Sequence, residues 1–163
     1  MVRQDGVTPV PLGFRYADVP SWATVLEVAP DPAVVFDASV RAAIRETGWA
    51  WRIRDNVSQI EMVLVPPGSF SMGCAGSTPN CGCPSDELPT HQVLLAAPFY
   101  LGRYEVTQSQ WQARMGQNPS AFSVATSQVP PALVPSRPVE TVSWDMIAGS
   151  GGFLERTGLR LPT

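Results

Sequence analysis

The sequence predicts an α+β fold that is rich in loops and contains short strands and a few short helices. Turn-forming residues are abundant, with 17 prolines and 13 glycines, a load typical of irregular loops. Runs of β-forming residues are short and bounded by proline or glycine, as at residues 61–65 and 99–104. The helical patterns at residues 37–47 and 107–115 are also short, and a glycine follows each of them.

Composition narrows the class of protein. The chain has 163 residues, of which 44% are hydrophobic and 15% charged, as expected for one globular domain with a core. A net charge of -3 provides no basic surface, which argues against binding nucleic acid through its phosphates. No stretch approaches the roughly 20 apolar residues of a membrane span, and no signal-peptide pattern is visible after Met1.

The first third divides into two expected parts. Residues 1–36 are rich in proline and predict an extended N-terminal arm with little regular structure. Trp22, Val25 and Leu26 either dock on the domain or belong to a loosely held arm. Residues 37–59 predict a short helix, ended by Gly48, and then a half-buried strand at 49–54. Its alternating tryptophans suit either ligand stacking or core packing, and packing is favoured.

Residues 60–163 predict the main body of the domain. The strands at 61–65 and 69–73 flank Pro66-Pro67-Gly68, which predicts a hairpin. Residues 87–107 predict two strands around Pro98, followed by a helix whose capping box is Thr107 and Gln110.

Further along, residues 121–136 predict a proline-marked loop, and Ser143 is placed to cap a helix. The glycines at 149–152 interrupt that helix, which resumes at 153–156 and stops at Gly158. Residues 160–163 look like the start of a further element, so the sequence predicts that this chain is part of a longer one.

All three cysteines lie in one polar loop, at Cys74, Cys81 and Cys83, and the only histidine, His91, follows. The spacing lacks the usual Cys-x2–4-Cys unit of zinc sites. A disulfide from Cys74 to Cys81 or Cys83 is favoured and would leave one thiol free; it suggests an extracytoplasmic location. A metal site and three free thiols are the alternatives.

Four titratable residues could carry proton chemistry. His91 and Glu87 could form a general acid–base pair, although a surface or structural histidine is the more common case. Glu105 lies among apolar neighbours and shares a strand face with Arg103. Its two interpretations are an ion pair with an arginine, which burial would require, and a role in catalysis. Glu140 allows the same two interpretations. No phosphate-binding loop or serine nucleophile elbow is present.

Four segments, in this order, resemble the formylglycine-generating enzyme family, also called the sulfatase-modifying factor domain. They are Ile-Glu-Met-Val-Leu-Val-Pro-Pro-Gly-Ser-Phe-Ser-Met-Gly at residues 60–73, Glu-Leu-Pro-Thr-His-Gln-Val at 87–93 leading to Phe-Tyr-Leu-Gly-Arg-Tyr-Glu-Val-Thr at 99–107, Arg-Pro-Val-Glu-Thr-Val-Ser-Trp at 137–144, and Arg-Leu-Pro-Thr at 160–163.

The resemblance implies a loop-rich variant of the C-type-lectin fold. The best-known members of this family oxidise a cysteine of a sulfatase to formylglycine, using oxygen and a copper ion held by two cysteines. Relatives form sulfur–carbon bonds with non-heme iron, and others have lost the catalytic residues. In the family, Arg-Leu-Pro-Thr is followed by Glu-Ala-Glu-Trp-Glu and a C-terminal half that holds the copper-binding cysteines and the calcium sites.

No residue of this chain matches a catalytic, cofactor-binding or metal-binding position of that family, so none is assigned. Residues 60–163 are expected to be the N-terminal part of the domain, an incomplete one, and to be inactive alone. A complete member would use copper and calcium and act on a sulfatase or another protein; the alternative is a non-catalytic lectin-like binding module. The isolated chain is expected to be marginally stable and prone to aggregate, with apolar strand faces exposed around Val93 and Tyr100.

Overall fold

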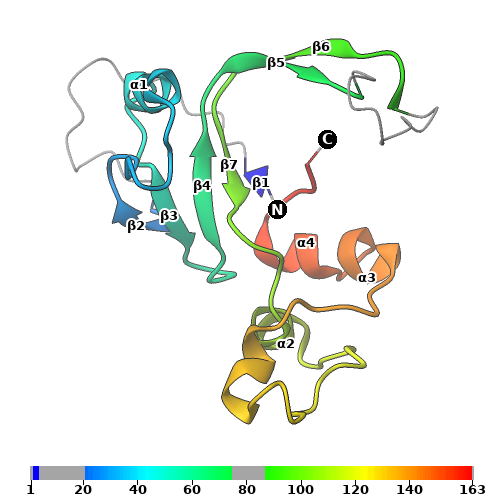
Figure 1. Cartoon of the computed structure of the whole chain (residues 1–163). Coiled ribbons are helices and arrows are strands. Elements are labelled where there is room, and N and C mark those ends of the chain that lie inside the picture. Colours follow the sequence, from blue (N-terminus) through cyan, green and yellow to red (C-terminus); the bar gives the residue numbers. More distant parts are fainter. Residues whose placement is uncertain (1, 4–20, 75–86, 163) are drawn as a thin grey trace.

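A computed structural model describes residues 2–3, 21–74 and 87–162. It confirms a mixed helix and sheet fold with short strands and a few short helices (Figure 1). The strands are β1 (Val2–Arg3), β2 (Ala23–Glu27), β3 (Arg52–Asp55), β4 (Glu61–Val65), β5 (Gly68–Met72), β6 (His91–Leu95) and β7 (Phe99–Gly102). The helices are α1 (Ala38–Glu46), α2 (Gln108–Met115), the 3-10 helix η3 (Pro131–Ser136), α3 (Trp144–Ala148) and α4 (Phe153–Thr157).

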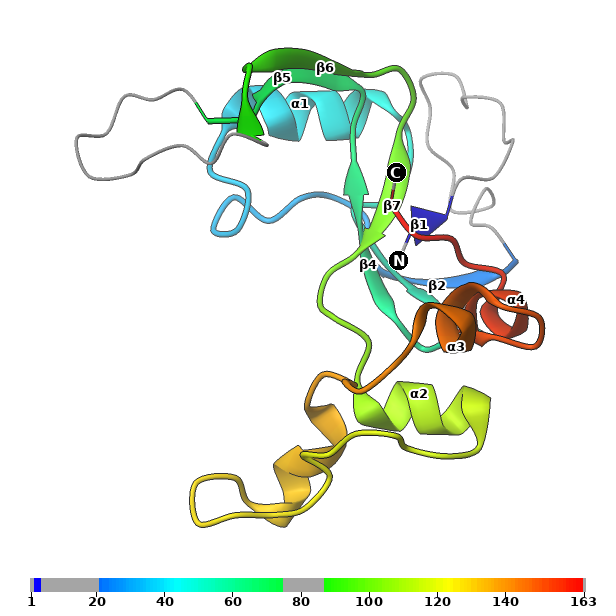
Figure 2. The ribbon, with the colours of Figure 1, turned by 90° about the vertical axis from the view of Figure 1, so that its right-hand side faces the viewer.

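Five strands form the main sheet in the order β1-β7-β4-β3-β2, and every neighbouring pair is antiparallel. Strands β5 and β6 form a separate two-stranded sheet, called here the β5–β6 ribbon. In Figure 1 this ribbon arches away from the upper end of β4 and β7. Figure 2 shows α2 at the opposite end of the molecule from the ribbon.

The prediction that the strands on either side of Pro66-Pro67-Gly68 pair as a hairpin is wrong. Strand β4 pairs with β3 and β7, whereas β5 pairs with β6. The chain from β4 to β5 is therefore one long bent arm, and β6 to β7 is the arm that returns beside it. A tight reversal is disfavoured here because the second proline would force the first out of the helical region that a type I turn needs.

The predicted N-terminal arm also needs correction within residues 21–36. Ala23–Glu27 is not irregular but forms β2, which pairs with β3 with a register shift between Val25 and Glu27. Trp22 and Val25 pack against the core, so the docked alternative is correct for this part. The prolines that suggested an irregular arm lie before and after the strand.

One face of the main sheet carries the core. Ile53, Met62, Leu64 and Tyr100 point to it and are at most 3% exposed. Tyr100 packs between two tryptophans, stacked on Trp49 with a centroid distance of 5.7 Å and edge-on to Trp22 at 6.1 Å. The tryptophan pattern at 49–54 thus reflects packing, as predicted.

The helices complete this core. Ile44 of α1, Trp111 of α2 and Phe153 of α4 are each at most 1% exposed, and Trp111 stacks on Phe153 at 5.0 Å. Because residues from β2 to Leu159 share one hydrophobic cluster, the segment before residue 52 belongs to the same packed unit as the segment after it.

The helices begin and end close to the residues that the sequence predicted. Asp37 caps α1, and Thr107 forms the predicted capping box with Gln110 at the start of α2. Gly116 and Gly158 end α2 and α4 in the left-handed conformation, with φ of 81° and 69°. Residues 121–136 are not entirely loop, because η3 forms at Pro131–Ser136.

The predicted glycine interruption separates α3 from α4. A Cβ at Gly152 would lie 2.7 Å from the Gly149 carbonyl oxygen and 2.8 Å from that of Ile147. This approach is too close for any side chain, so the glycine permits the tight connection between the two helices.

The β5–β6 ribbon carries exposed apolar side chains. Phe70, Met72 and Leu94 are 47%, 53% and 74% exposed, and Val93 is half-buried. The expectation that Tyr100 would also be exposed is wrong, since it is 3% exposed in the core. Among the described residues, no helix is long and apolar enough to span a bilayer.

Candidate functional site

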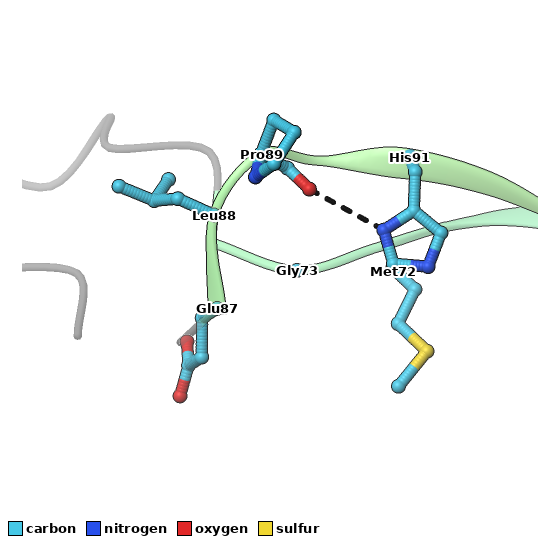
Figure 3. A pocket seen from close by; sticks show the side chains of 6 residues that line it. All are labelled: Met72, Gly73, Glu87, Leu88, Pro89 and His91. Atoms are coloured by element: carbon cyan, nitrogen blue, oxygen red, sulfur yellow. Dashed lines mark hydrogen bonds between the residues drawn. The ribbon is translucent and has the colours of Figure 1, made fainter. Parts of the chain in front are cut away.

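The predicted acid–base pair lies at the far end of the β5–β6 ribbon. A hollow of about 620 Å³ there is lined by Met72, Gly73, Glu87, Leu88, Pro89 and His91. Figure 3 shows the imidazole hanging from β6 beside Met72, while the Glu87 carboxylate points away from it.

The structure does not join His91 to Glu87. The ring Nδ1 of His91 lies 3.3 Å from the Pro89 carbonyl oxygen, and both His91 and Glu87 are exposed. An acid–base pair needs hydrogen-bond distance between its members or a shared substrate. The geometry therefore supports the structural interpretation of His91.

The backbone holds this hollow in shape. Gly73 has a φ of 104°, and a Cβ there would lie 2.6 Å from the Glu87 carbonyl oxygen. The next residue, Cys74, donates its N–H to the same oxygen at 3.1 Å. Only glycine fits this approach of the two arms.

Cys74 is disulfide-bonded. Cys81 and Cys83 lie outside the described residues, so the predicted choice between Cys74–Cys81 and Cys74–Cys83 remains a prediction. Among residues 2–3, 21–74 and 87–162, no group of three or more His, Cys, Asp or Glu side chains could hold a metal ion.

A second, polar hollow lies where the open face of the main sheet meets α2. Its volume is about 660 Å³. It is called here the Glu61 hollow, after the carboxylate on which its arginines converge. Its lining is polar except for Ile60 and Tyr104, and consists of Arg52, Arg54, Gln59, Ile60, Glu61, Arg103, Tyr104, Glu105, Thr107, Ser109, Gln110 and Ser136.

Strand register creates the convergence. Arg54 lies directly opposite Glu61 and Arg52 opposite Val63, so both arginines share the sheet face with Glu61 and point away from the core. The Arg52 Nη1 donates to Glu61 Oε2 at 3.1 Å, and the Arg54 Nη2 donates to Oε1 at 3.0 Å. Arg52 also donates to Glu27 of β2.

Arg103 completes the cluster from the end of β7. Its Nη1 lies 3.7 Å from Glu61 Oε2, and its guanidinium lies over the Tyr104 ring at 5.0 Å. The backbone N–H of Arg103 donates to the Glu61 carbonyl at 2.9 Å, which fixes where its side chain begins.

These contacts shift acid–base equilibria in a defined direction. The hydrogen bond from Arg54, together with Arg52, lowers the pKa of Glu61 more than burial raises it. The hydrogen bond to Glu27 raises the pKa of Arg52. Both shifts favour the charged forms of Glu61 and Arg52.

The expectation for Glu105 is wrong, since its side chain is exposed and Arg103 contacts Glu61 instead. Glu140 has a structural role. It accepts the Phe122 backbone N–H at 2.9 Å, and this bond, with the Thr141 hydroxyl, lowers the pKa of Glu140. Its own N–H donates to the Ser120 hydroxyl at 3.2 Å, so Glu140 ties two loops together.

Sequence reasoning missed the Glu61 cluster. The available signal was the alternation Arg52-Ile53-Arg54, which places both arginines on one face of a strand, and Glu61 at the start of the next strand. A turn centred between these strands pairs Glu61 with Arg54. The contribution of Arg103 could not be found in the same way, because β7 is distant in sequence.

Comparison with known proteins gives three findings. The protein-family model of the sulfatase-modifying factor enzyme 1-like domain matches residues 52–163. The "Chaperone protein LppX" of Paenibacillus barcinonensis is 48% identical over 46 residues, which are 28% of this chain and 13% of that protein. The structure of PvdO from Pseudomonas aeruginosa is similar at a TM-score of 0.46, with 26% identity over 66% of this chain and 44% of that one.

The matched parts span less than half of either relative. The family match, by contrast, covers most of this chain and includes all four segments that carry the resemblance. It also includes most strands of the main sheet and both helices that supply the stacked pair Trp111 and Phe153. The chain belongs to the family of the sulfatase-modifying factor enzyme 1-like domain.

Proposed function

We propose that this chain is the scaffold part of a formylglycine-generating-enzyme-like protein. The complete protein would oxidise a protein cysteine to formylglycine or carry out related oxygen-dependent sulfur chemistry. The family match over residues 52–163 carries the proposal. The same residues supply most of the core, including Met62, Tyr100, Trp111 and Phe153, as a scaffold role requires.

The proposal gives this chain no catalytic residue. In the family, copper is held by a cysteine pair that no position of this sequence matches, and calcium is held in the C-terminal half. Copper and calcium therefore belong, in this proposal, to a longer protein that contains the chain. The 163-residue chain alone would be inactive.

The proposed partner is a polypeptide, either a sulfatase or another protein that presents a cysteine. The name of the relative from Paenibacillus barcinonensis describes a chaperone, which would also handle other polypeptides. That likeness covers 46 residues and supports only a general affinity for protein partners.

The test compares the chain with a longer protein. The purified 163-residue chain is incubated with copper and a cysteine-containing sulfatase peptide, and aldehyde formation is followed by mass spectrometry and aldehyde-specific labelling. We expect no turnover by the chain alone and turnover by a longer product of the same locus that continues into a cysteine pair. The same peptide with serine in place of cysteine is the control.

Two outcomes would overturn the proposal. Turnover by the chain alone would show that the catalytic group lies within it. A longer product that contains no cysteine pair, and that binds the peptide without oxidising it, would favour the non-catalytic lectin-like binding module instead.

A further inference from the structure

The Glu61 hollow contains more hydrogen-bond donors than its own residues use. Among the described residues, the Arg54 side chain hydrogen-bonds to Glu61 alone. Within the described residues, the guanidinium of Arg103 makes none and only approaches Glu61 at 3.7 Å. A guanidinium carries five N–H donors in a rigid planar arrangement, so both arginines retain donors for a ligand.

The charges of the cluster leave Arg103 as the arginine that a carboxylate engages least. Three arginines and two glutamates line the hollow, and Glu27 beside the lining is paired with Arg52. Arg52 and Arg54 are hydrogen-bonded to carboxylates, whereas Arg103 only approaches Glu61. A single additional carboxylate at Arg103 would place less negative charge beside Glu61 and Glu105 than a doubly charged phosphate would.

The first turn of α2 contributes a positive field at the edge of the hollow. Thr107, Ser109 and Gln110 line the hollow, and they lie at the start of an eight-residue helix, where the helix dipole is positive. Thr107 and Gln110 satisfy each other in the capping box. The Ser109 backbone N–H makes no hydrogen bond to a described residue and remains available.

The hollow is larger than a carboxylate alone requires. Tyr104 lies beside Arg103 and is 63% exposed. Its ring offers an apolar surface next to the free guanidinium donors. An organic body that bears a carboxylate, such as an acidic side chain on a peptide, would use both features.

We propose that the Glu61 hollow binds a carboxylate side chain of an acidic polypeptide segment, held by Arg103 and Arg54 and flanked by Tyr104. This site is separate from any cysteine chemistry and does not rest on the proposed function. A peptide could bind here whether or not a longer protein that contains the chain is an enzyme.

The experiment titrates the full chain with a short acetylated and amidated peptide that contains two glutamates and one phenylalanine. Backbone amide shifts in ¹⁵N NMR report the location of binding. We expect shifts at Ser109, Gln110 and Arg103, and none in the β5–β6 ribbon. The matched peptide with glutamine in place of glutamate should bind at least about tenfold more weakly, because each hydrogen bond to a charged group contributes strongly to affinity.

Three variants test the assignment. Arg103→Gln should weaken binding about tenfold, and it should fold normally because the Arg103 guanidinium makes no hydrogen bond to a described residue. Glu105→Gln should tighten binding, because it removes a negative charge from the lining. Arg45→Gln, at an exposed position in the last turn of α1, changes the net charge equally and should leave affinity unchanged.

The proposal fails if the glutamate and glutamine peptides bind equally, or if Arg45→Gln weakens binding as much as Arg103→Gln does. Inorganic phosphate and acetate are competed against the peptide in separate titrations. Displacement by phosphate at much lower concentration than by acetate would identify a phosphate site and overturn the carboxylate assignment. No binding of the acidic peptide at low ionic strength, where charge attraction is strongest, would also overturn it.

Discussion

The hydroxyl of Tyr100 donates a 2.8 Å hydrogen bond to the backbone carbonyl of Ala50. This bond ties β7 to the segment just before β3, next to the contacts that the Tyr100 ring makes with Trp49, which stacks on it, and with Trp22, which meets it edge-on. Burial raises the pKa of Tyr100. The hydroxyl is therefore protonated and able to donate at neutral pH.

Tyr100→Phe should destabilise the protein by about 1–2 kcal/mol, because it leaves the Ala50 carbonyl without its donor in a dry environment. Urea unfolding followed by tryptophan fluorescence measures the free energy of unfolding. Tyr104→Phe, at a position that is 63% exposed, is the control and should change stability by less than about 0.5 kcal/mol. Equal effects of the two substitutions would show that the Tyr100 bond contributes nothing.

Glu61→Gln should destabilise the protein by about 1–2 kcal/mol at neutral pH, because two charge-assisted hydrogen bonds weaken at a side chain that is 27% exposed. Glu105→Gln is the matched control at an exposed position. Urea midpoints at low and at moderate ionic strength give the difference. No loss in Glu61→Gln would mean that solvent screens the cluster fully.

The same cluster predicts how stability depends on pH. Because the arginines lower the folded-state pKa of Glu61, its contribution is fully present above the ordinary glutamate pKa of about 4.3 and is lost as pH falls through the lower folded-state value. The stability difference between the wild type and Glu61→Gln should therefore shrink on acidification below about pH 4. A difference that grows at low pH would contradict the direction of the pKa shift.

Thiol titration tests the cysteine loop. With Cys74 disulfide-bonded and three cysteines in the chain, the unfolded but unreduced protein should expose a single thiol. Reduction should raise the count to three. Peptide mapping without reduction then decides between Cys74–Cys81 and Cys74–Cys83. Three thiols before reduction, or stoichiometric metal in the purified protein, would contradict the disulfide prediction.

The exposed apolar side chains of the β5–β6 ribbon should cause self-association. Phe70→Thr should lower the concentration dependence of light scattering, because it removes a 47% exposed aromatic ring and keeps a residue suited to strands. Leu133→Thr in η3, at a position that is 55% exposed, is the control and should scatter as the wild type does. Equal scattering by all three proteins would place the association elsewhere.

Sequence reasoning succeeded where the signal is local. The capping box of Thr107 and Gln110, and the helix ends at Gly116 and Gly158, depend on residues a few positions apart, so the pattern contains the whole interaction. The packing role of Trp49 was also predictable, because a large aromatic residue next to a half-buried strand is most often part of a core.

It failed where the partner is distant. Pro66-Pro67-Gly68 looks like a reversal locally, yet β4 pairs with β7 and β5 with β6, across a separation that no local signal specifies. Strand β2 was hidden for the same reason, since its pairing with β3 outweighs the prolines around it. Arg103 approaches Glu61 through the long-range pairing of β4 with β7, which is why this arginine was not placed beside Glu61 from sequence.

The long bent pair of arms also determines where the chain can change length. Between the paired positions Val65–Phe99 and Gly68–Leu95, one arm has two residues, Pro66 and Pro67, and the other has three, Ala96 to Pro98. Since side chains alternate between faces, the insertion or deletion of one residue at this bend would move the side chains of one whole strand to the opposite face. Beyond the last pair, Met72–His91, the two described arms still meet where Gly73 and Cys74 contact Glu87. An engineered tag or reporter is therefore expected to disturb the described strands least when it is inserted between residues 74 and 87.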